Sequence, residues 1–149
     1  LPLVICLLVL ASCGRGADGV VDPSINEPQV EYPLVQGIYD LTAPITFGIP
    51  GAQYLGTINL VQSSRKKSGF GGDYAVQIVG PNGERSKTFT GTISGQVANS
   101  GAISFNFFDG SRNDHSWTGS LSGATISGTW IIRAPDGSSL SGTFTATRR

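Results

Sequence analysis

The sequence predicts an all-β fold, an antiparallel eight-stranded up-and-down barrel that follows an apolar leader and an extended tether. Three observations support this prediction. Apolar and polar residues alternate with a period of two in eight runs, turn residues separate the runs, and glycine recurs on the apolar face. We expect the leader over 1–12, the tether over 13–36 and the barrel over 37–149.

The leader is almost wholly apolar. Its run LPLVICLLVLA has 11 residues. A membrane-spanning helix needs about 20 residues, whereas the apolar core of a secretory signal peptide needs about 7–15. The length therefore predicts a signal peptide. The basic residues that normally precede such a core are missing, so we expect the segment to be truncated at its N-terminus.

The end of the leader carries a resemblance to a known family. Leu10-Ala11-Ser12-Cys13 resembles the lipobox of bacterial lipoproteins. The resemblance implies cleavage before Cys13, a diacylglycerol on its sulfur, and lipid anchoring in a bacterial cell envelope. Gly14 stands where an aspartate would retain such a protein in the inner membrane, which implies the outer membrane if the organism is Gram-negative. The alternative is an ordinary secretory peptide cut elsewhere, which leaves Cys13 as a free thiol.

The tether is punctuated by prolines. Pro23, Pro28 and Pro33 are spaced by five residues, with acidic residues between them and no hydrophobic periodicity. Proline favours the extended polyproline II conformation, and like charges repel one another. We therefore expect an extended spacer, with a first strand over 30–35 as the alternative.

Eight alternating runs define the barrel. Their inward positions are Tyr39, Leu41, Ala43, Ile45 and Phe47; Tyr54, Gly56, Ile58 and Leu60; Tyr74, Val76 and Ile78; Phe89, Gly91, Ile93, Gly95 and Val97; Ile103, Phe105 and Phe107; Trp117, Gly119 and Leu121; Ile126, Gly128, Trp130 and Ile132; Leu140, Gly142, Phe144 and Ala146. Turn sequences such as Pro135-Asp136-Gly137 separate them. Small inward glycines beside large residues favour a narrow barrel, with a β-sandwich as the alternative. The other face is rich in Ser and Thr, so we expect it to contact water.

Two motifs resemble those of small barrel families. Gly37-Ile38-Tyr39 is similar to the lipocalin opening Gly-x-Trp, and the resemblance implies that Arg148 packs on Tyr39. The stretch 117–132 resembles an avidin hairpin, but the first run has no counterpart of the avidin biotin contacts, so no biotin-binding residue is transferred.

Six inward aromatic residues are the candidate ligand-lining residues, and they either surround a hollow interior or fill it. They are Phe89, Phe105, Phe107, Trp117, Trp130 and Phe144. A cavity of about 300 Å³ or more would support a ligand carrier. A filled barrel would favour a protein-binding or inhibitory module that acts through its rim. The candidate rim residues are Arg85, Phe108, Arg112 and His115, and Phe108 should point outward because it breaks the alternation.

Basic residues gather at the tether side. We expect the stretch SSRKKSGFGG, residues 63–72, to be a flexible Ser/Gly loop that carries Arg65, Lys66 and Lys67. In an eight-strand meander, this loop shares an end with Arg148 and Arg149. We expect this end to face either anionic headgroups, where each cation adds about 1 kcal/mol, or water.

Other chemistry is not indicated. The formal net charge is zero, which does not favour nucleic acid as a partner. Asp114, His115 and Ser116 are adjacent, and adjacent strand residues point to opposite faces, so they cannot converge as a catalytic triad. With one His and two Cys in the chain, zinc is not expected. Asp109 and Asp114 with Asn113 could form an oxygen cage for calcium, but we expect a solvated turn because their spacing does not match an EF-hand. The sequence therefore predicts a non-enzymatic binding protein without metal or cofactor, whose partners are the membrane and either a small apolar ligand or an envelope protein.

Overall fold

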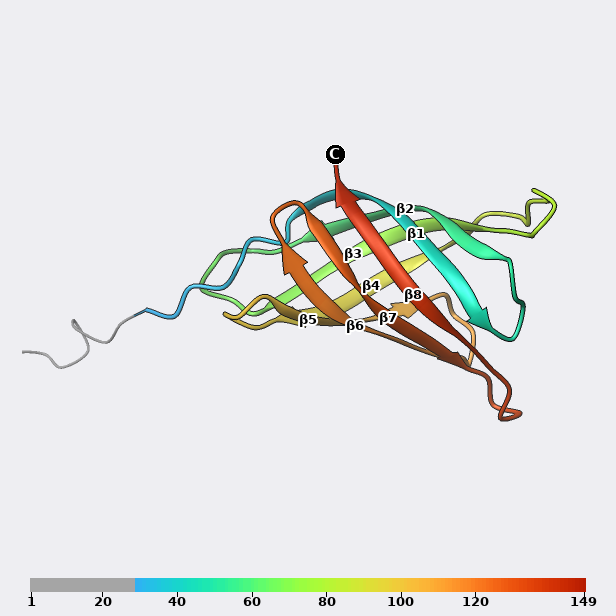
Figure 1. Cartoon of the computed structure of the whole chain (residues 1–149). Helices are drawn as coiled ribbons and strands as arrows, with labels where there is room; N and C mark the ends of the chain where they lie inside the picture. Colours follow the sequence, from blue (N-terminus) through green and yellow to red (C-terminus); the bar gives the residue numbers. More distant parts are fainter. Residues whose placement is uncertain (1–28) are drawn as a thin grey trace, which may run out of the picture.

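Eight strands follow one another along the chain, and each pairs antiparallel with the next (Figure 1). The computed structural model describes residues 29–149. The strands are β1 (Gly37–Phe47), β2 (Gln53–Val61), β3 (Gly69–Val79), β4 (Phe89–Val97), β5 (Ala102–Phe108), β6 (Asp114–Ser122), β7 (Thr125–Arg133) and β8 (Ser139–Arg148). β8 also pairs with β1, which closes the sheet. The predicted up-and-down barrel is confirmed, and the alternative sandwich is wrong because one closed sheet forms the whole wall.

The period of two in the sequence determines which side chains fill the barrel. In β5, Ile103, Phe105 and Phe107 are buried, and the residue after each of them is exposed. Successive side chains of a strand point to opposite faces, so apolar residues at every second position enter one shared core. Burial of this core stabilises the barrel by about 25 cal/mol for each Å² of apolar surface removed from water.

Inward glycines let neighbouring strands approach closely. Gly119 of β6 lies directly opposite Gly128 of β7. A Cβ atom at Gly119 would overlap the backbone of Ser127, and a Cβ atom at Gly128 would overlap the backbone of Thr118. The recurring Gly-containing unit of the sequence therefore marks a place where only a hydrogen atom fits between two strands.

Two details of the wall differ from the sequence prediction. β3 begins at Gly69, within a stretch expected to be a Ser/Gly loop, and Phe70 is buried. Its glycines serve close packing, since a Cβ atom at Gly72 would overlap the backbone of Asn59. Phe47, expected to point inward, is 62% exposed, because the pairing of β1 with β8 shifts register between Ile45 and Phe47.

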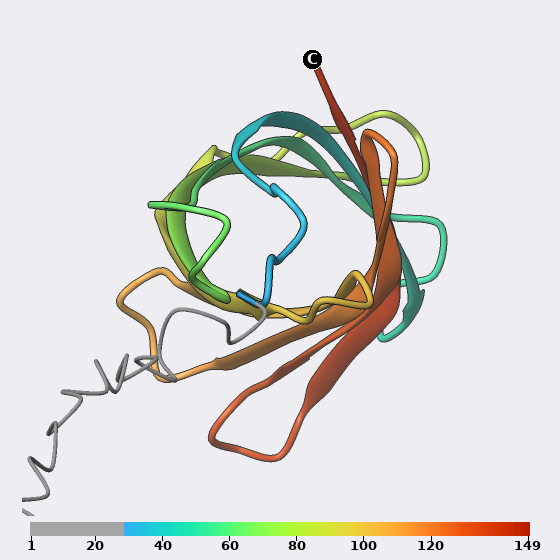
Figure 2. The ribbon, with the colours of Figure 1, turned by 90° about the vertical axis from the view of Figure 1, so that its left-hand side faces the viewer.

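The two ends of the barrel have different coverings. The end with loops 62–68, 98–101 and 123–124 also receives the segment 29–36 and the end of β8, and we call it the closed end. Figure 2 looks onto this end and shows the segment running across the barrel opening. The opposite end carries loops 48–52, 80–88, 109–113 and 134–138, and we call it the open end. No helix among residues 29–149 is long and apolar enough to cross a membrane.

The segment 29–36 packs onto the barrel over its last residues. Val35 is fully buried, and its N–H donates to Oε1 of Gln62 over 3.0 Å. The hydroxyl of Tyr39 donates to the carbonyl of Val35 over 2.8 Å, and the N–H of Tyr32 donates to the carbonyl of Arg65 over 2.8 Å. The prediction of a free spacer reaching residue 36 is therefore wrong for these residues. They form no strand. They remain packed on the closed end because the side chain of Val35 is buried there and the backbone groups of Tyr32 and Val35 form hydrogen bonds with the barrel.

Candidate functional site

A cavity of about 160 Å³ lies inside the open end of the barrel. Side chains from seven strands and one loop converge on it because inward positions near the ends of the strands face one another. Its lining residues are Tyr54, Tyr74, Val76, Phe89, Phe107, Asp109, Asn113, His115, Trp117, Ile132 and Leu140. The lining is mainly apolar and aromatic, and a few polar groups are added from β6 and from the loop that precedes it.

A stack of aromatic rings separates the cavity from the filled half of the barrel. The ring of Phe107 stacks on Tyr74 with centroids 4.2 Å apart and on Trp117 with centroids 4.6 Å apart. Trp117 in turn stacks on Trp130 at 5.4 Å. Offset stacks of this kind are favourable and rigid. The stack therefore gives the cavity a fixed floor.

The six predicted ligand-lining aromatics divide into two groups. Phe89, Phe107 and Trp117 line the cavity, as predicted. Phe105, Trp130 and Phe144 belong to the packed core, and Phe105 and Phe144 meet edge to face at 5.7 Å. The interior is thus filled toward the closed end and hollow toward the open end. The cavity is smaller than the 300 Å³ that we set for a carrier of a typical ligand.

The predicted position of the polar residue His115 was wrong. It was expected on the rim, but it lies in β6 with only 8% of its surface exposed and lines the cavity. The alternation that points Trp117 inward also points His115 inward, two residues earlier. Asp114 points outward and pairs with Arg133 at 3.7 Å, so the expectation that Asp114 and His115 do not converge is confirmed.

Both ring nitrogens of His115 are buried, and among residues 29–149 neither has a hydrogen-bond partner. The nearest carboxylate oxygen, Oδ2 of Asp109, lies 3.7 Å from Nε2, which is too long for a hydrogen bond. Burial lowers the pKa of His115 below 6.5, although the carboxylates of Asp109 and Asp114 oppose the shift. The imidazole is therefore neutral at pH 7 and carries one donor and one acceptor, both of them buried in the wall of the cavity.

Trp117 carries a third unpaired polar atom. Its Nε1 is buried and lacks a partner within the described part of the chain. Its neighbour Trp130 shows the ordinary arrangement, in which Nε1–H donates to the carbonyl of Thr143 over 3.0 Å. A buried donor left without a partner costs about 1–3 kcal/mol. The polar atoms of His115 and Trp117 therefore lack a hydrogen-bonding partner that residues 29–149 could provide.

Asp109 and two tyrosines complete the polar part of the lining. Burial opposes ionisation of Asp109, but hydrogen bonds from Ser111 and the nearby His115 outweigh it and hold the pKa of its carboxyl below the usual value. Burial and the Asp109 carboxylate raise the pKa of Tyr54, and they raise the pKa of Tyr74 to about 12. Both phenols stay protonated at neutral pH. Oδ1 of Asp109 accepts from the N–H of Ser111 over 2.8 Å, which forms a turn.

The other predicted rim residues lie around the open end but outside the cavity. Arg85 and Arg112 are exposed in loops 80–88 and 109–113. The side chain of Arg85 donates to Oε1 of Gln77 over 3.3 Å. Phe108 is 52% exposed, so the prediction that it points outward is confirmed.

Three of the five predicted membrane-facing cations have partners among residues 29–149. The guanidinium of Arg148 lies 5.3 Å from the ring centroid of Tyr39 and donates to its hydroxyl, which confirms the packing implied by the lipocalin resemblance. Arg149 pairs with Asp40 at 2.7 Å. Arg65 lies 4.0 Å from a carboxylate oxygen of Glu31.

Lys66 and Lys67 have no ion-pair partner among residues 29–149. All five predicted cations share the closed end, as the meander predicted. Cys13 and the predicted leader lie outside the described residues.

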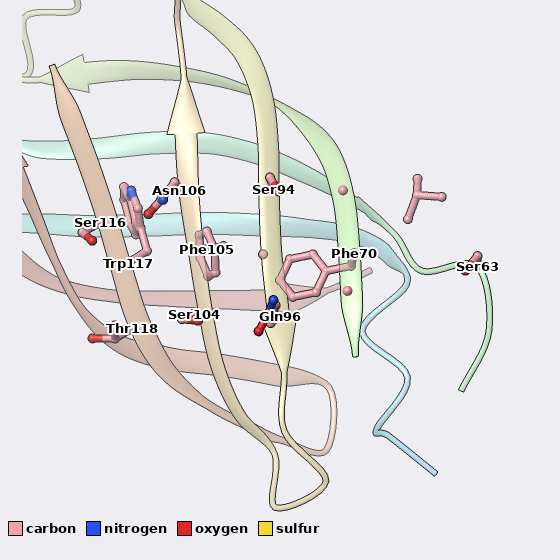
Figure 3. Close-up of a pocket in the computed structure, with 14 residues that line it drawn as sticks. Ser63, Phe70, Ser94, Gln96, Ser104, Phe105, Asn106, Ser116, Trp117 and Thr118 are labelled. Carbon is pink, nitrogen blue, oxygen red and sulfur yellow. The ribbon is translucent and has the colours of Figure 1, made fainter. Parts of the chain in front are cut away.

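A larger depression covers the outer face of β3, β4, β5 and β6 (Figure 3). It measures about 660 Å³, and its polar side chains are uncharged. They include Ser94, Gln96, Ser104, Asn106 and Thr118, all of which are exposed. Because these side chains are exposed, water can meet their hydrogen-bonding needs, so the smaller cavity inside the barrel is the better candidate site. Among residues 29–149, no group of three His, Cys, Asp or Glu side chains is placed to hold a metal ion.

Several lining residues were missed from sequence. Tyr54, Tyr74, Val76 and Ile132 were placed on the inward face but were not singled out as cavity residues. Alternation distinguishes inward from outward residues, and it does not show which inward residues lie near the open end. Their position within each run, next to an open-end loop, is the signal that could have found them.

Comparison with known proteins adds information on the fold. The sequence matches no protein-family model and no curated protein. Among solved structures, the chain is similar to EF1p2_mFAP2b bound to DFHBI, with 12% identity and a TM-score of 0.53 over 76% of this chain and 93% of that one. It is also similar to a de novo designed fluorescence-activating β-barrel, with 16% identity and a TM-score of 0.49 over 76% and 93% of the two chains. At such low identity, the first likeness shows the barrel fold alone.

Proposed function

We propose that this protein is a lipid-anchored binding protein whose open-end cavity holds a small, neutral, largely apolar ligand with a hydrogen-bonding group. The observation that carries the proposal is the set of buried polar atoms of His115 and Trp117 beside an otherwise apolar cavity. Native proteins rarely leave such atoms unpaired, and a ligand hydroxyl that enters the cavity would pair with one of them after a small shift of the ring that carries it. The similar barrel EF1p2_mFAP2b, which was solved with DFHBI, supports the idea that this architecture can hold a small molecule.

The size of the cavity defines the ligand further. A dry apolar cavity of about 150 Å³ is known to hold one benzene molecule. A cavity of about 160 Å³ therefore suits a single ring. The lining contains one carboxylate, Asp109, and neither Lys nor Arg, so an anionic group is disfavoured in the cavity. Phenol meets these requirements, and toluene is the matched compound without a hydroxyl group.

Calorimetric titration with phenol and toluene tests the cavity. A form covering 14–149 keeps every described residue of the closed barrel. We expect phenol to bind at least tenfold more tightly than toluene, and His115→Leu to reverse the order, because a site with unpaired polar atoms rejects a ligand that cannot pair them. Phe108→Ala, on the outer surface, is the control and should change neither affinity. If neither compound binds, the cavity proposal fails, and a protein partner at the open-end rim, where Phe47 and Ile49 are exposed, becomes the better candidate.

Anchoring through Cys13 is supported by the lipobox-like sequence. The barrel is consistent with a tether at the closed end, where the described chain begins and Lys66 and Lys67 are exposed. Exposed apolar residues Ile38 and Val61 lie on adjacent strands at the same end. This arrangement would place the closed end on the membrane and the open end away from it.

Two measurements test the anchor. The full chain expressed in a bacterium should incorporate labelled palmitate and enter the membrane fraction, and Cys13→Ser should abolish the label. The unlipidated form 14–149 should co-sediment with anionic vesicles more than with neutral ones, and the double variant Lys66→Gln, Lys67→Gln should remove the difference. Equal sedimentation with both vesicles would contradict a membrane-facing closed end without affecting the lipidation result.

A further inference from the structure

A second depression adjoins the cavity at the open end. It measures about 330 Å³ and lies between loop 134–138, the start of β8 and the loop that follows β1. Its wall includes Gly48, Ala134 and Ser139, and its lining is mostly apolar. We call it the groove.

The cavity and the groove share part of their walls. Asn113, Ile132 and Leu140 line both. Leu140 is only partly buried, and it reaches across to the loop after β1, where a Cβ atom at Gly48 would overlap its Cδ2 atom. Leucine side chains change rotamer readily when they are partly exposed. A movement of Leu140 would therefore connect the two spaces without a change in the barrel wall.

We propose that the ligand is a phenolic lipid, whose hydroxylated ring occupies the cavity and whose uncharged alkyl tail lies in the groove. This inference rests on the proposed function of the cavity. The cavity alone is smaller than about 300 Å³, where ligand pockets usually begin, and the groove supplies the missing volume. His115 and Trp117 bind the hydroxyl group, and Leu140 rotates to let the tail pass.

The carboxylate in the cavity lining disfavours one obvious alternative. A fatty acid would bring a carboxylate toward Asp109, which lines the cavity and is ionised at neutral pH. The histidine beside it is neutral, and Lys87, whose Nζ lies 5.8 Å from the ring centroid of Phe89, is not part of the lining. A neutral phenol avoids this repulsion, because its hydroxyl group pairs with one nitrogen of His115 without bringing a net charge.

A series of phenols with tails of increasing length tests the proposal. We would measure affinities of phenol, 4-ethylphenol, 4-butylphenol and 4-hexylphenol for the form 14–149. We expect the affinity to rise about fourfold for each methylene that enters the groove. In Ala134→Phe, which fills the groove, phenol should bind as before and the gain with tail length should disappear. Ala102→Phe, on the exposed outer face of β5, is the matched control and should keep the gain.

The outcomes separate the two proposals. If phenol binds but the affinity does not change with tail length, the groove inference is overturned and the cavity function stands. The same holds if Ala134→Phe keeps the full gain. If neither phenol nor any longer compound binds, the proposed function itself fails, and the inference fails with it.

Discussion

The closed and open ends of the barrel differ in whether their buried polar side chains have hydrogen-bond partners. Gln62 and His115 are the two buried polar or charged residues among 29–149, and one lies at each end. At the closed end, Oε1 of Gln62 accepts from the N–H of Val35, and its Nε2 donates to the carbonyl of Lys67 over 2.9 Å. At the open end, both nitrogens of His115 lack partners within the described chain. The comparison separates a polar residue that stabilises the fold from one that is available for binding.

The largest expected effect compares the filled half of the barrel with the cavity wall. Phe144 is 2% exposed and packs against Phe105 and Trp117, whereas Phe89 is half-buried beside the cavity. Phe144→Ala should lower the free energy of unfolding by about 3–5 kcal/mol, because it leaves a void in a tightly packed core. Phe89→Ala should cost about 1 kcal/mol, because its neighbours already face open space. Urea unfolding measures both, and equal losses would contradict the division into a filled and a hollow half.

A pair of leucine substitutions tests the two polar residues directly. Gln62→Leu should destabilise the barrel by about 1–3 kcal/mol, since it leaves the Val35 N–H buried without a partner and removes the hydrogen bond to the Lys67 carbonyl. His115→Leu should stabilise the ligand-free barrel by a similar amount, since it removes two unpaired polar atoms. Thermal and urea unfolding of both variants check the signs. Destabilisation by His115→Leu would show that His115 has a structural partner and is not reserved for a ligand.

A smaller effect concerns pH. Burial holds the pKa of His115 below its unfolded value of 6.5, so the unfolded chain takes up a proton first as the pH falls. Stability should therefore be full above about pH 6.5 and decline as the pH drops toward the pKa of the folded state. His115 is the single histidine of the chain, so His115→Leu should remove the slope between pH 7.5 and 5. A slope that persists in the variant would assign the proton uptake to another group.

The smallest effect is expected at the outer surface of the wall. Phe108→Ala should change the free energy of unfolding by less than about 0.5 kcal/mol, because the ring is 52% exposed. Urea unfolding of Phe108→Ala and Phe144→Ala in parallel compares the stability loss at an exposed ring with the loss at a buried one. A loss above about 3 kcal/mol would place Phe108 in the core.

The fold could be predicted from the sequence because alternation acts locally. Each run of β5, β6 and β7 carries its own inward and outward faces, and turn residues mark where the chain reverses. Phe47 was wrongly predicted to point inward because its exposure depends on a register shift against β8, a strand about 95 residues further along the chain. The packing of Val35 was missed for a similar reason, since its partner Gln62 belongs to another loop.

The site was only partly predictable. The aromatic residues could be assigned to the interior, but the stacking of Phe107, Trp117 and Trp130 decides which part of the interior remains open. His115 could have been assigned inward by extending the alternation of Trp117 by two residues. The lack of hydrogen-bond partners for His115 depends on residues from other strands, so it could not be predicted from the local sequence.

The aromatic stack also makes the protein its own optical reporter. Trp117 and Trp130 are the two tryptophans of the whole chain, and they lie against each other with Trp117 in the cavity wall. All of the intrinsic indole fluorescence therefore originates at the boundary between the filled and hollow halves. A molecule that enters the cavity alters the surroundings of this one chromophore pair, so occupancy can be followed by light emission without a label, a tag or an engineered residue.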